Sequence, residues 1–135
     1  RSNNNNIYTN KLIMNLLNQK GIEIKEYYDD INDFYKEVDV LCLPSIDEGF
    51  GMVVLEAMSN GIPTIISKNV GASDLLKDKE DGIIIDDQSS MAVLDAMKFF
   101  INNKEEIYNY GYRAYNNVQA ILRNDLYKDA LKKII

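Results

Sequence analysis

Short apolar runs alternate with amphipathic stretches along this chain. Three runs, at residues 38–43, 62–67 and 82–85, are apolar almost throughout and predict strands. The run at 38–43 is typical of a strand buried on both faces of a parallel sheet, and the run at 62–67 of a buried strand. Residues 22–27 alternate between apolar and polar side chains and predict one further strand. The segments between these strands carry apolar residues at helical spacing. Strands that alternate with helices in this way predict an α/β fold with a parallel sheet.

The helices are predicted by the spacing of their apolar residues and by the residues at their ends. Ser89 or Ser90 is of a type that caps a helix N-terminus, and the helix that follows carries Met97 and Ile101 on its apolar face. The other predicted helices cover residues 8–19, 29–36, 49–60, 71–76, 107–118 and 122–134.

The composition is that of an ordinary folded domain. The chain has 135 residues, of which 46% are hydrophobic and 27% charged, enough for one globular domain. Its net charge of −6 and the absence of a basic cluster argue against nucleic acid as a partner. The chain contains no histidine, which excludes Ser-His-Asp sites and the usual zinc sites within it. Its single cysteine, Cys42, lies in a predicted strand, and we expect a reducing, cytoplasmic setting.

Residues 38–56 combine a strand, a turn and the start of a helix. Pro44 ends the strand, because proline cannot donate to a sheet ladder, and the glycine-containing turn 49–51 opens the helical pattern. Such a turn presents free backbone N–H groups and the positive end of the helix dipole, which suit a phosphate. Glu48 precedes the turn and Glu56 follows it, and carboxylates accept hydrogen bonds from hydroxyl groups. This segment therefore predicts a site for a ligand that carries both phosphate and hydroxyl groups.

The same residues resemble the donor-site signature of retaining GT-B glycosyltransferases. The stretch E-G-F-G-M-V-V-L-E-A-M-S-N-G-I-P-T-I-I-S begins at Glu48 and holds two glutamates separated by seven residues. The likeness is dense over residues 38–86 and looser toward the C-terminus. It implies a Rossmann-like parallel sheet with flanking helices, equivalent to a truncated C-terminal half of a GT-B fold. Residues 1–135 are then expected to be a partial nucleotide-sugar (donor) binding domain without the N-terminal acceptor domain, and residues 1–6 a disordered polar tag.

The resemblance also implies a role for each residue around the turn. Glu48 is expected to be the catalytic residue and to bind hydroxyl groups of the donor sugar, whereas Glu56 is expected to bind the ribose hydroxyls of the nucleotide. Backbone amides of the turn are expected to contact the sugar and the diphosphate, and the Phe50 ring is expected to pack rather than bind. The donor-binding set implied in this way is Glu48, Gly49, Phe50, Gly51, Met52, Val53 and Glu56.

Several of these residues have a purely structural alternative. Glu56 could be an ordinary exposed helix glutamate, but its apolar sequence neighbours argue against that, because an unpaired charge among them is costly. Tyr27 and Tyr28 stand where the family places the nucleobase, although a surface tyrosine pair is the favoured interpretation. Ala72 and Asp74 replace a glycine and a glutamate of the family pattern, which weakens the transfer of roles there.

The implied function is that of a retaining, hexosyltransferase-type glycosyltransferase fragment that uses a UDP-, GDP- or ADP-sugar and an unidentified acceptor. The alternative is a non-catalytic sugar-nucleotide-binding or interaction module. No cofactor other than the donor substrate is implied, and no metal is required. We find neither the Arg and Lys with which the family holds the donor pyrophosphate nor an acceptor domain, so we expect the isolated fragment to be inactive. Missing strands would leave a sheet edge that favours self-association, and membrane association of the full enzyme is left open.

Overall fold

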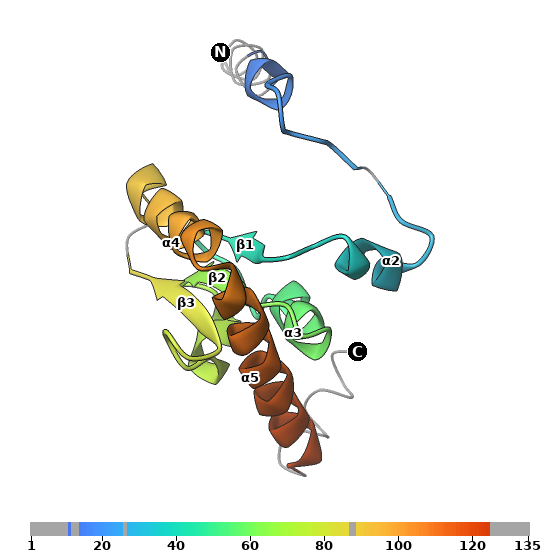
Figure 1. The fold of residues 1–135 in the computed structure, drawn as a ribbon, viewed down its shortest axis with the longest axis vertical. Helices are drawn as coiled ribbons and strands as arrows, with labels where there is room; N and C mark the ends of the chain where they lie inside the picture. Colours follow the sequence, from blue (N-terminus) through green and yellow to red (C-terminus); the bar gives the residue numbers. More distant parts are fainter. Residues whose placement is uncertain (1–10, 12–13, 26, 87–88, 125–135) are drawn as a thin grey trace. The chain divides into compact units, whose positions relative to one another are not determined.

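A computed structural model describes residues 11, 14–25, 27–86 and 89–124 of the chain. The chain divides into two units, Arg1–Asp33 and Phe34–Ile135, which Figure 1 draws in sequence colours. The predicted tag at residues 1–6 and the predicted last helix, apart from its first residues, lie outside the described residues.

The first unit shows little regular structure among its described residues. Residues 14–17 are helical, inside the helix predicted at 8–19. The strand predicted at residues 22–27 is wrong, because its described residues form no strand, and Ile22 and Ile24 are 48% and 56% exposed. An alternating sequence becomes a strand only when a neighbouring strand pairs with it. No such partner is present in the described part of this unit.

The second unit is built on a parallel sheet whose strands lie in the order β1-β2-β3. The strands are β1 (Leu41–Leu43), β2 (Thr64–Ser67) and β3 (Gly82–Ile85), and they confirm the three strands predicted from the apolar runs. In the register of the sheet, Thr64 of β2 lies between Leu41 and Gly82. All four residues of β2 are buried, since β2 is the central strand.

Strand β1 differs from the prediction of a doubly buried strand at residues 38–43. Its three residues are only half-buried. The reason is its position at the edge of the described sheet, where β2 pairs with it on one side. In the part of the chain that the structure describes, the other side of β1 is therefore an open edge.

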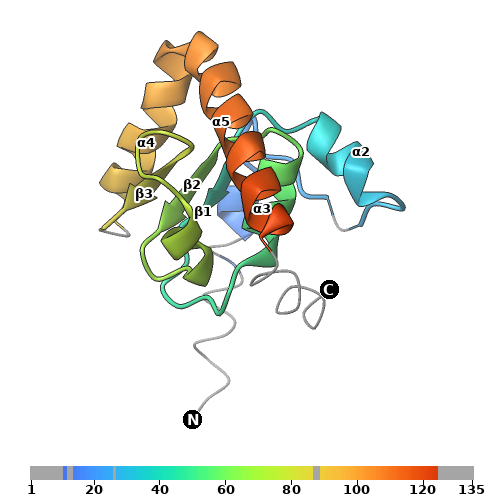
Figure 2. The same ribbon diagram turned by 90° about the horizontal axis from the view of Figure 1, so that it is seen from below.

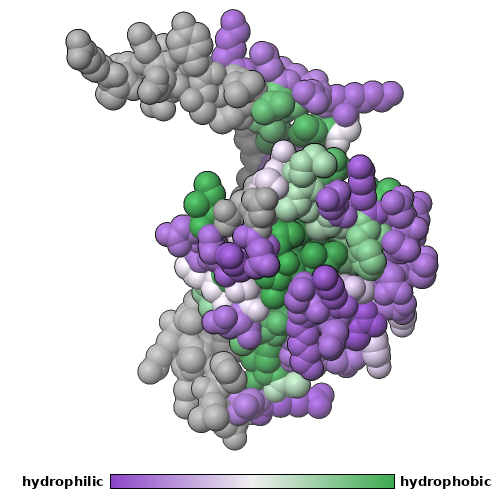
Figure 3. Space-filling model, turned by 90° about the vertical axis from the view of Figure 1, so that its left-hand side faces the viewer, coloured by the Kyte–Doolittle hydropathy of each residue, from purple (hydrophilic) through white to green (hydrophobic). Residues whose placement is uncertain are grey.

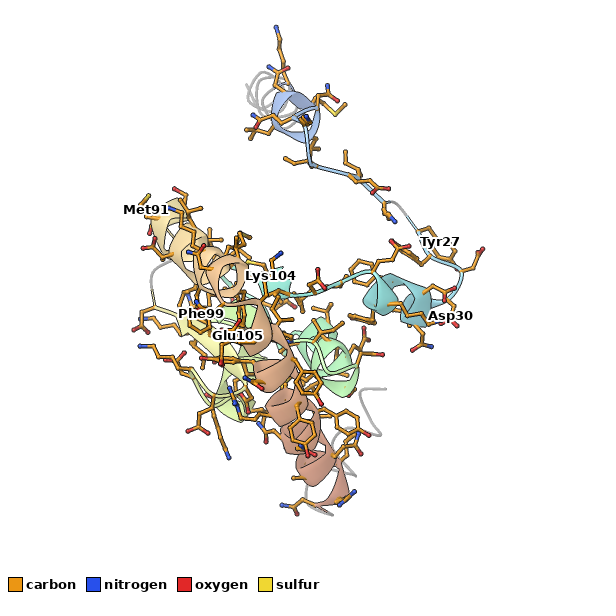
Figure 4. All side chains as sticks on the ribbon, viewed as in Figure 1. Tyr27, Asp30, Met91, Phe99, Lys104 and Glu105 are labelled. Carbon is orange, nitrogen blue, oxygen red and sulfur yellow. The ribbon has the colours of Figure 1, made fainter. Side chains whose placement is uncertain are left out.

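Helices cover both faces of the sheet (Figure 2). Successive side chains of a strand point to opposite faces, so Ile66 packs with α3 (Met52–Ser59) and α5 (Lys104–Arg123), whereas Ile65 packs with α4 (Ser90–Asn102). Phe99 on α4, labelled in Figure 4, lies 5.6 Å from the Tyr110 ring on α5. Together these elements form the expected helix–sheet–helix arrangement, with one hydrophobic cluster on each face of the sheet.

Helix α4 begins as predicted but is less buried than predicted. The Ser89 side chain caps it by accepting a hydrogen bond from Ala92 N at 3.2 Å. Phe100 is buried, but Met97 and Ile101 are 39% and 65% exposed. The apolar side of α4 is thus wider than the part of the helix that packs against the described sheet.

The segment before β3 is anchored to α5 through Asp81. This carboxylate is 1% exposed and accepts hydrogen bonds from Lys77 N at 2.8 Å and from Asn117 Nδ2 at 2.6 Å. Burial raises the pKa of Asp81, although these hydrogen bonds oppose the shift. The anchor fixes the chain between η1 (Gly71–Leu75), a 3-10 helix at the predicted position, and β3.

The surface beside β3 is mixed in character. Figure 3 views the side on which Figure 1 draws β3 and α4, and hydrophobic side chains are seen there between hydrophilic ones. Ile83 and Ile84 of this strand are half-buried.

Among the helices of the described residues, none combines the length and the apolar character that a membrane span needs.

Candidate functional site

Two loops meet beyond the C-terminal ends of β1 and β2. Residues 44–51 follow β1, and residues 68–70 follow β2 and lead into η1. Because the two strands are parallel neighbours, both loops start from the same end of the sheet, the one formed by the carboxyl ends of the strands. Open α/β sheets bind their ligands at this carboxyl end.

A series of hydrogen bonds ties the two loops together. The donors and acceptors are Ser67 Oγ to Ser45 O, Asn69 Nδ2 to Ile46 O (2.9 Å), Glu48 N to Asn69 O (3.5 Å), Gly71 N to Gly49 O (3.0 Å) and Ala72 N to Phe50 O (2.8 Å). Glu48 and Val70 also form a parallel bridge, so strand-like pairing resumes after Pro44. The turn predicted at residues 49–51 is therefore held in place by a second loop about twenty residues further along the chain.

Two glycines make this arrangement sterically feasible. Gly51 has φ 76° and ψ 58°, in the left-handed region that side chains other than hydrogen disfavour. Gly71 lies so close to the first loop that a Cβ on it would be 2.3 Å from Gly49 O and 3.0 Å from Phe50 Cα. Glycine is thus needed at position 51 for the backbone conformation and at position 71 for close approach.

The N-terminus of α3 follows directly on this turn and has no capping side chain. Gly51 is the N-cap residue, it has no side chain to cap the helix, and the first turn contains no acidic residue. Met52 and Val53 are the first helical residues, and backbone N–H groups at this position have no partner within the helix. The helix dipole adds a partial positive charge at the same place. The local geometry therefore suits an anionic group such as a phosphate.

The two glutamates occupy different environments. Glu48 is half-buried in the first loop, whereas Glu56 lies in the second turn of α3 and is exposed. The expectation that apolar neighbours surround Glu56 is wrong. Leu55 and Ala57 are buried, but the helix turns Glu56 to the opposite side.

Glu56 nevertheless has a partner, which the sequence analysis missed. The Tyr35 hydroxyl of α2 (Ile31–Lys36) donates a hydrogen bond to Glu56 Oε2 at 2.8 Å. Burial raises the pKa of the Tyr35 phenol, and the hydrogen bond and the charge of Glu56 raise it further. The phenol therefore remains protonated and acts as the donor. The two residues are 21 positions apart, and no local pattern links them.

The remaining residues singled out from the sequence lie as follows. The Phe50 side chain packs against the cluster around α3 and α5, in line with a packing role. Ala72 is fully buried in the same cluster, and Asp74 is exposed in η1. Tyr27, labelled in Figure 4, belongs to the first unit and is 81% exposed. The Tyr28 ring lies 5.2 Å from Lys25 Nζ.

A cavity of about 770 Å³ lies away from the two loops. It opens beside residues that precede or form β1 and β2, at the N-terminal side of the sheet, and Cys42, Ile65, Met97 and Ile101 line it. Burial raises the pKa of the Cys42 thiol. The cavity is mainly apolar and lacks a carboxylate pair, so the chemistry predicted from the sequence belongs to the loops and not to this cavity. The described residues contain no group of three or more His, Cys, Asp or Glu side chains that could hold a metal ion.

Comparisons with known proteins show the family to which the chain belongs. The family model described as Glycosyl transferases group 1 matches residues 3–117. The D-inositol 3-phosphate glycosyltransferase of Corynebacterium glutamicum is 28% identical over 104 residues, which are 72% of this chain and 25% of that protein. The chain thus spans about a quarter of the length of this relative.

Solved structures share the fold at low sequence identity. The C-terminal domain of a group 1 family glycosyl transferase from Francisella tularensis superposes with a TM-score of 0.74 at 22% identity, over 90% of this chain and 66% of that one. The Anabaena protein HepE, solved in complex with UDP-glucose, superposes with a TM-score of 0.76 at 20% identity, over 96% of this chain and 38% of that one. These superpositions show a common fold.

Proposed function

Because the chain belongs to the glycosyl transferases group 1 family, we propose that it is part of the donor-binding domain of a retaining glycosyltransferase. The family and the Rossmann-like α/β fold expected from the sequence are confirmed. The observation that carries the proposal is a glycine turn that leads directly into an uncapped helix N-terminus at the carboxyl end of the sheet, with one glutamate before the turn and one in the second turn of the helix. The turn ends at Gly51, the helix is α3, and the two glutamates are Glu48 and Glu56.

In this proposal, each part of the site serves a different part of a nucleotide-sugar. Backbone amides of residues 49–53 contact the sugar and the diphosphate. Glu48 accepts hydrogen bonds from sugar hydroxyls, and Glu56 accepts them from the ribose. A vicinal diol offers two donors, which a carboxylate with two acceptor oxygens can receive together.

The same features would also assist the transfer step. When the bond between the sugar and the diphosphate breaks, negative charge develops on the leaving diphosphate. Fixed backbone amides and the dipole of α3 stabilise that charge without rearranging during the reaction. Stabilising the leaving diphosphate in this way requires neither a side-chain nucleophile nor a metal.

We further propose that more polypeptide of the same parent protein packs against the open edge of β1. Two observations support this. The chain corresponds to 66% of the isolated C-terminal domain from Francisella tularensis. In addition, the cavity of about 770 Å³ lies where Met97 and Ile101 of α4 extend past the described sheet. A strand added at this edge would cover apolar side chains and pair backbone groups, which would remove a surface that otherwise favours self-association.

The proposed donor site is tested with a panel of UDP, GDP, ADP and their hexose conjugates. We expect one nucleotide series to raise the unfolding temperature of the chain, because a ligand that binds only the folded state stabilises it by about 2.7 kcal/mol at a hundred times its dissociation constant. UDP and UDP-glucose are the first ligands to measure, since HepE was solved with UDP-glucose. If no member of the panel shifts the unfolding temperature, either of this chain or of the whole parent protein, the donor-site proposal is wrong.

The chain by itself is expected to transfer no sugar. Transfer requires an acceptor held against the donor, and the chain spans only about a quarter of a full-length relative. The measurement is transfer of a radiolabelled sugar from the donor found in the panel, with hydrolysis of the donor as the control. Transfer above hydrolysis by the chain alone would contradict the expectation. Binding without transfer by the whole parent protein would favour the alternative of a non-catalytic module.

A further inference from the structure

The hydroxyl of Tyr35 donates a hydrogen bond to one carboxylate oxygen of Glu56, a residue that is exposed. The donor–acceptor distance from Tyr35 OH to Glu56 Oε2 is 2.8 Å. A second, longer approach of 3.5 Å joins the same hydroxyl to the carbonyl of Val53, one turn earlier in α3. The phenol thus reaches α3 on the side where Glu56 emerges.

The position of the Tyr35 hydroxyl is set by packing. The side chain is 4% exposed and belongs to a cluster with Ala57 and Ile62. Its ring meets that of Phe34 edge-on, with 5.1 Å between the centroids. A tyrosine ring has few rotatable bonds, so a buried ring places its hydroxyl at a defined point.

Glu56 differs from Tyr35 in this respect. An exposed glutamate side chain is free to sample several rotamers, and ordering it on binding costs conformational entropy. A hydrogen bond from a fixed donor removes part of that freedom before any ligand arrives. The bond occupies one acceptor position on Oε2, and it leaves Oε1 and the other lone pairs of the carboxylate for further donors.

We propose that Tyr35 is a positioning residue, which orients the Glu56 carboxylate so that its remaining acceptor positions receive the two hydroxyls of a nucleotide ribose. The inference rests on the donor site proposed above. It adds a residue from α2, outside the loop and helix that carry the glutamates. A preorganised acceptor binds more tightly than one that must be ordered on binding.

The first test compares Tyr35→Phe with the wild-type chain. The substitution retains the ring and removes the hydroxyl. We expect the affinity for UDP, or for whichever nucleotide the panel identifies, to fall on the order of three- to tenfold. The affinity for the 2′,3′-dideoxy form of the same nucleotide is expected to stay unchanged, because that form lacks the hydroxyls that Glu56 would bind. Calorimetry on folded protein measures both affinities, and Tyr115→Phe, on the 43% exposed Tyr115 of α5, is the matched control.

The outcomes separate this inference from the function on which it rests. Equal losses for the nucleotide and its dideoxy form would assign Tyr35 a structural role only and overturn the inference. So would an unchanged affinity in Tyr35→Phe while Glu56→Gln weakens binding, but the donor site would then stand. If the wild type binds no nucleotide either as this chain or within the whole parent protein, or if it binds both forms equally, the ribose role of Glu56 is overturned and the inference with it.

The hydrogen bond itself is tested without changing a buried side chain. In protein labelled with [13C]tyrosine, the Cζ resonance of Tyr35 reports on the hydrogen bond of its hydroxyl. We expect Glu56→Ala to shift this resonance and leave that of Tyr115 unchanged. An unchanged Tyr35 resonance would show that the pair does not form in solution, which overturns the inference even if Tyr35→Phe fails to fold.

Discussion

Replacing Gly71 with alanine is expected to lower the free energy of unfolding by about 1–3 kcal/mol, the usual range for an overpacked site. The added Cβ would lie 2.3 Å from Gly49 O and 3.0 Å from Phe50 Cα, and these are backbone atoms that cannot rotate away. The two loops must separate, and the hydrogen bonds from Gly71 N and Ala72 N to the first loop must lengthen. For a domain of this size, the unfolding temperature should fall by roughly 3–12 °C.

Gly49→Ala is the matched control for this experiment. Gly49 belongs to the same contact between the loops, but a Cβ on it would meet nothing within 4 Å. We expect its effect on the free energy of unfolding to stay within about 0.5 kcal/mol. Thermal unfolding of the two variants and the wild type, followed by circular dichroism, makes the comparison. Equal stability of Gly71→Ala and Gly49→Ala would contradict the close approach of the two loops.

The second large effect is expected from Glu56→Gln in the whole parent protein, if its donor site is as proposed above. If Glu56 binds the ribose, the substitution should weaken the free nucleotide and the nucleotide-sugar alike. A hydrogen bond to a charged group contributes about 1.5–3 kcal/mol, which corresponds to a loss of roughly tenfold to hundredfold in affinity. Because Glu56 is exposed, the fold should be little affected.

Glu48→Gln provides the contrast that makes this result informative. If Glu48 binds only the transferred sugar, the variant should keep the affinity for free nucleotide and lose kcat/KM for transfer. If the two glutamates only interacted with the dipole of α3, the two variants would not differ in this way in nucleotide affinity and kcat/KM. Calorimetry with the free nucleotide and steady-state kinetics with the nucleotide-sugar measure the two effects. Wild-type nucleotide affinity in a folded Glu56→Gln variant would remove the ribose role of Glu56.

The sequence alone determined the features of this protein that depend on neighbouring residues. The strand at Gly82–Ile85 and the Ser89 cap of α4 were predicted correctly. The glycine turn before α3 was recognised as well, because Pro44 cannot continue a strand and glycine permits the left-handed backbone that Gly51 adopts. Apolar periodicity and turn chemistry act within a few residues, so reading the chain in order is sufficient to find them.

Tertiary structure alone decided which surfaces are covered. The alternating pattern at residues 22–27 forms no strand in its described part, and β1 is half-buried instead of doubly buried. Met97 and Ile101 remain exposed although they lie on the apolar side of α4. Periodicity states which side of an element is apolar, but burial depends on whether another element lies against that side.

In the candidate site, too, some features were indicated by the sequence and others were decided by the tertiary structure. The resemblance to the family signature singled out Glu48 and Glu56, and their roles stay predictions, whereas the sequence did not indicate the exposure of Glu56, its bond to Tyr35 or the hydrogen bonds between the two loops. Each of these contacts joins residues about twenty positions apart, such as Asn69 and Ile46. Such contacts depend on how the fold places segments that are distant in the sequence, and a local sequence pattern carries no information about that.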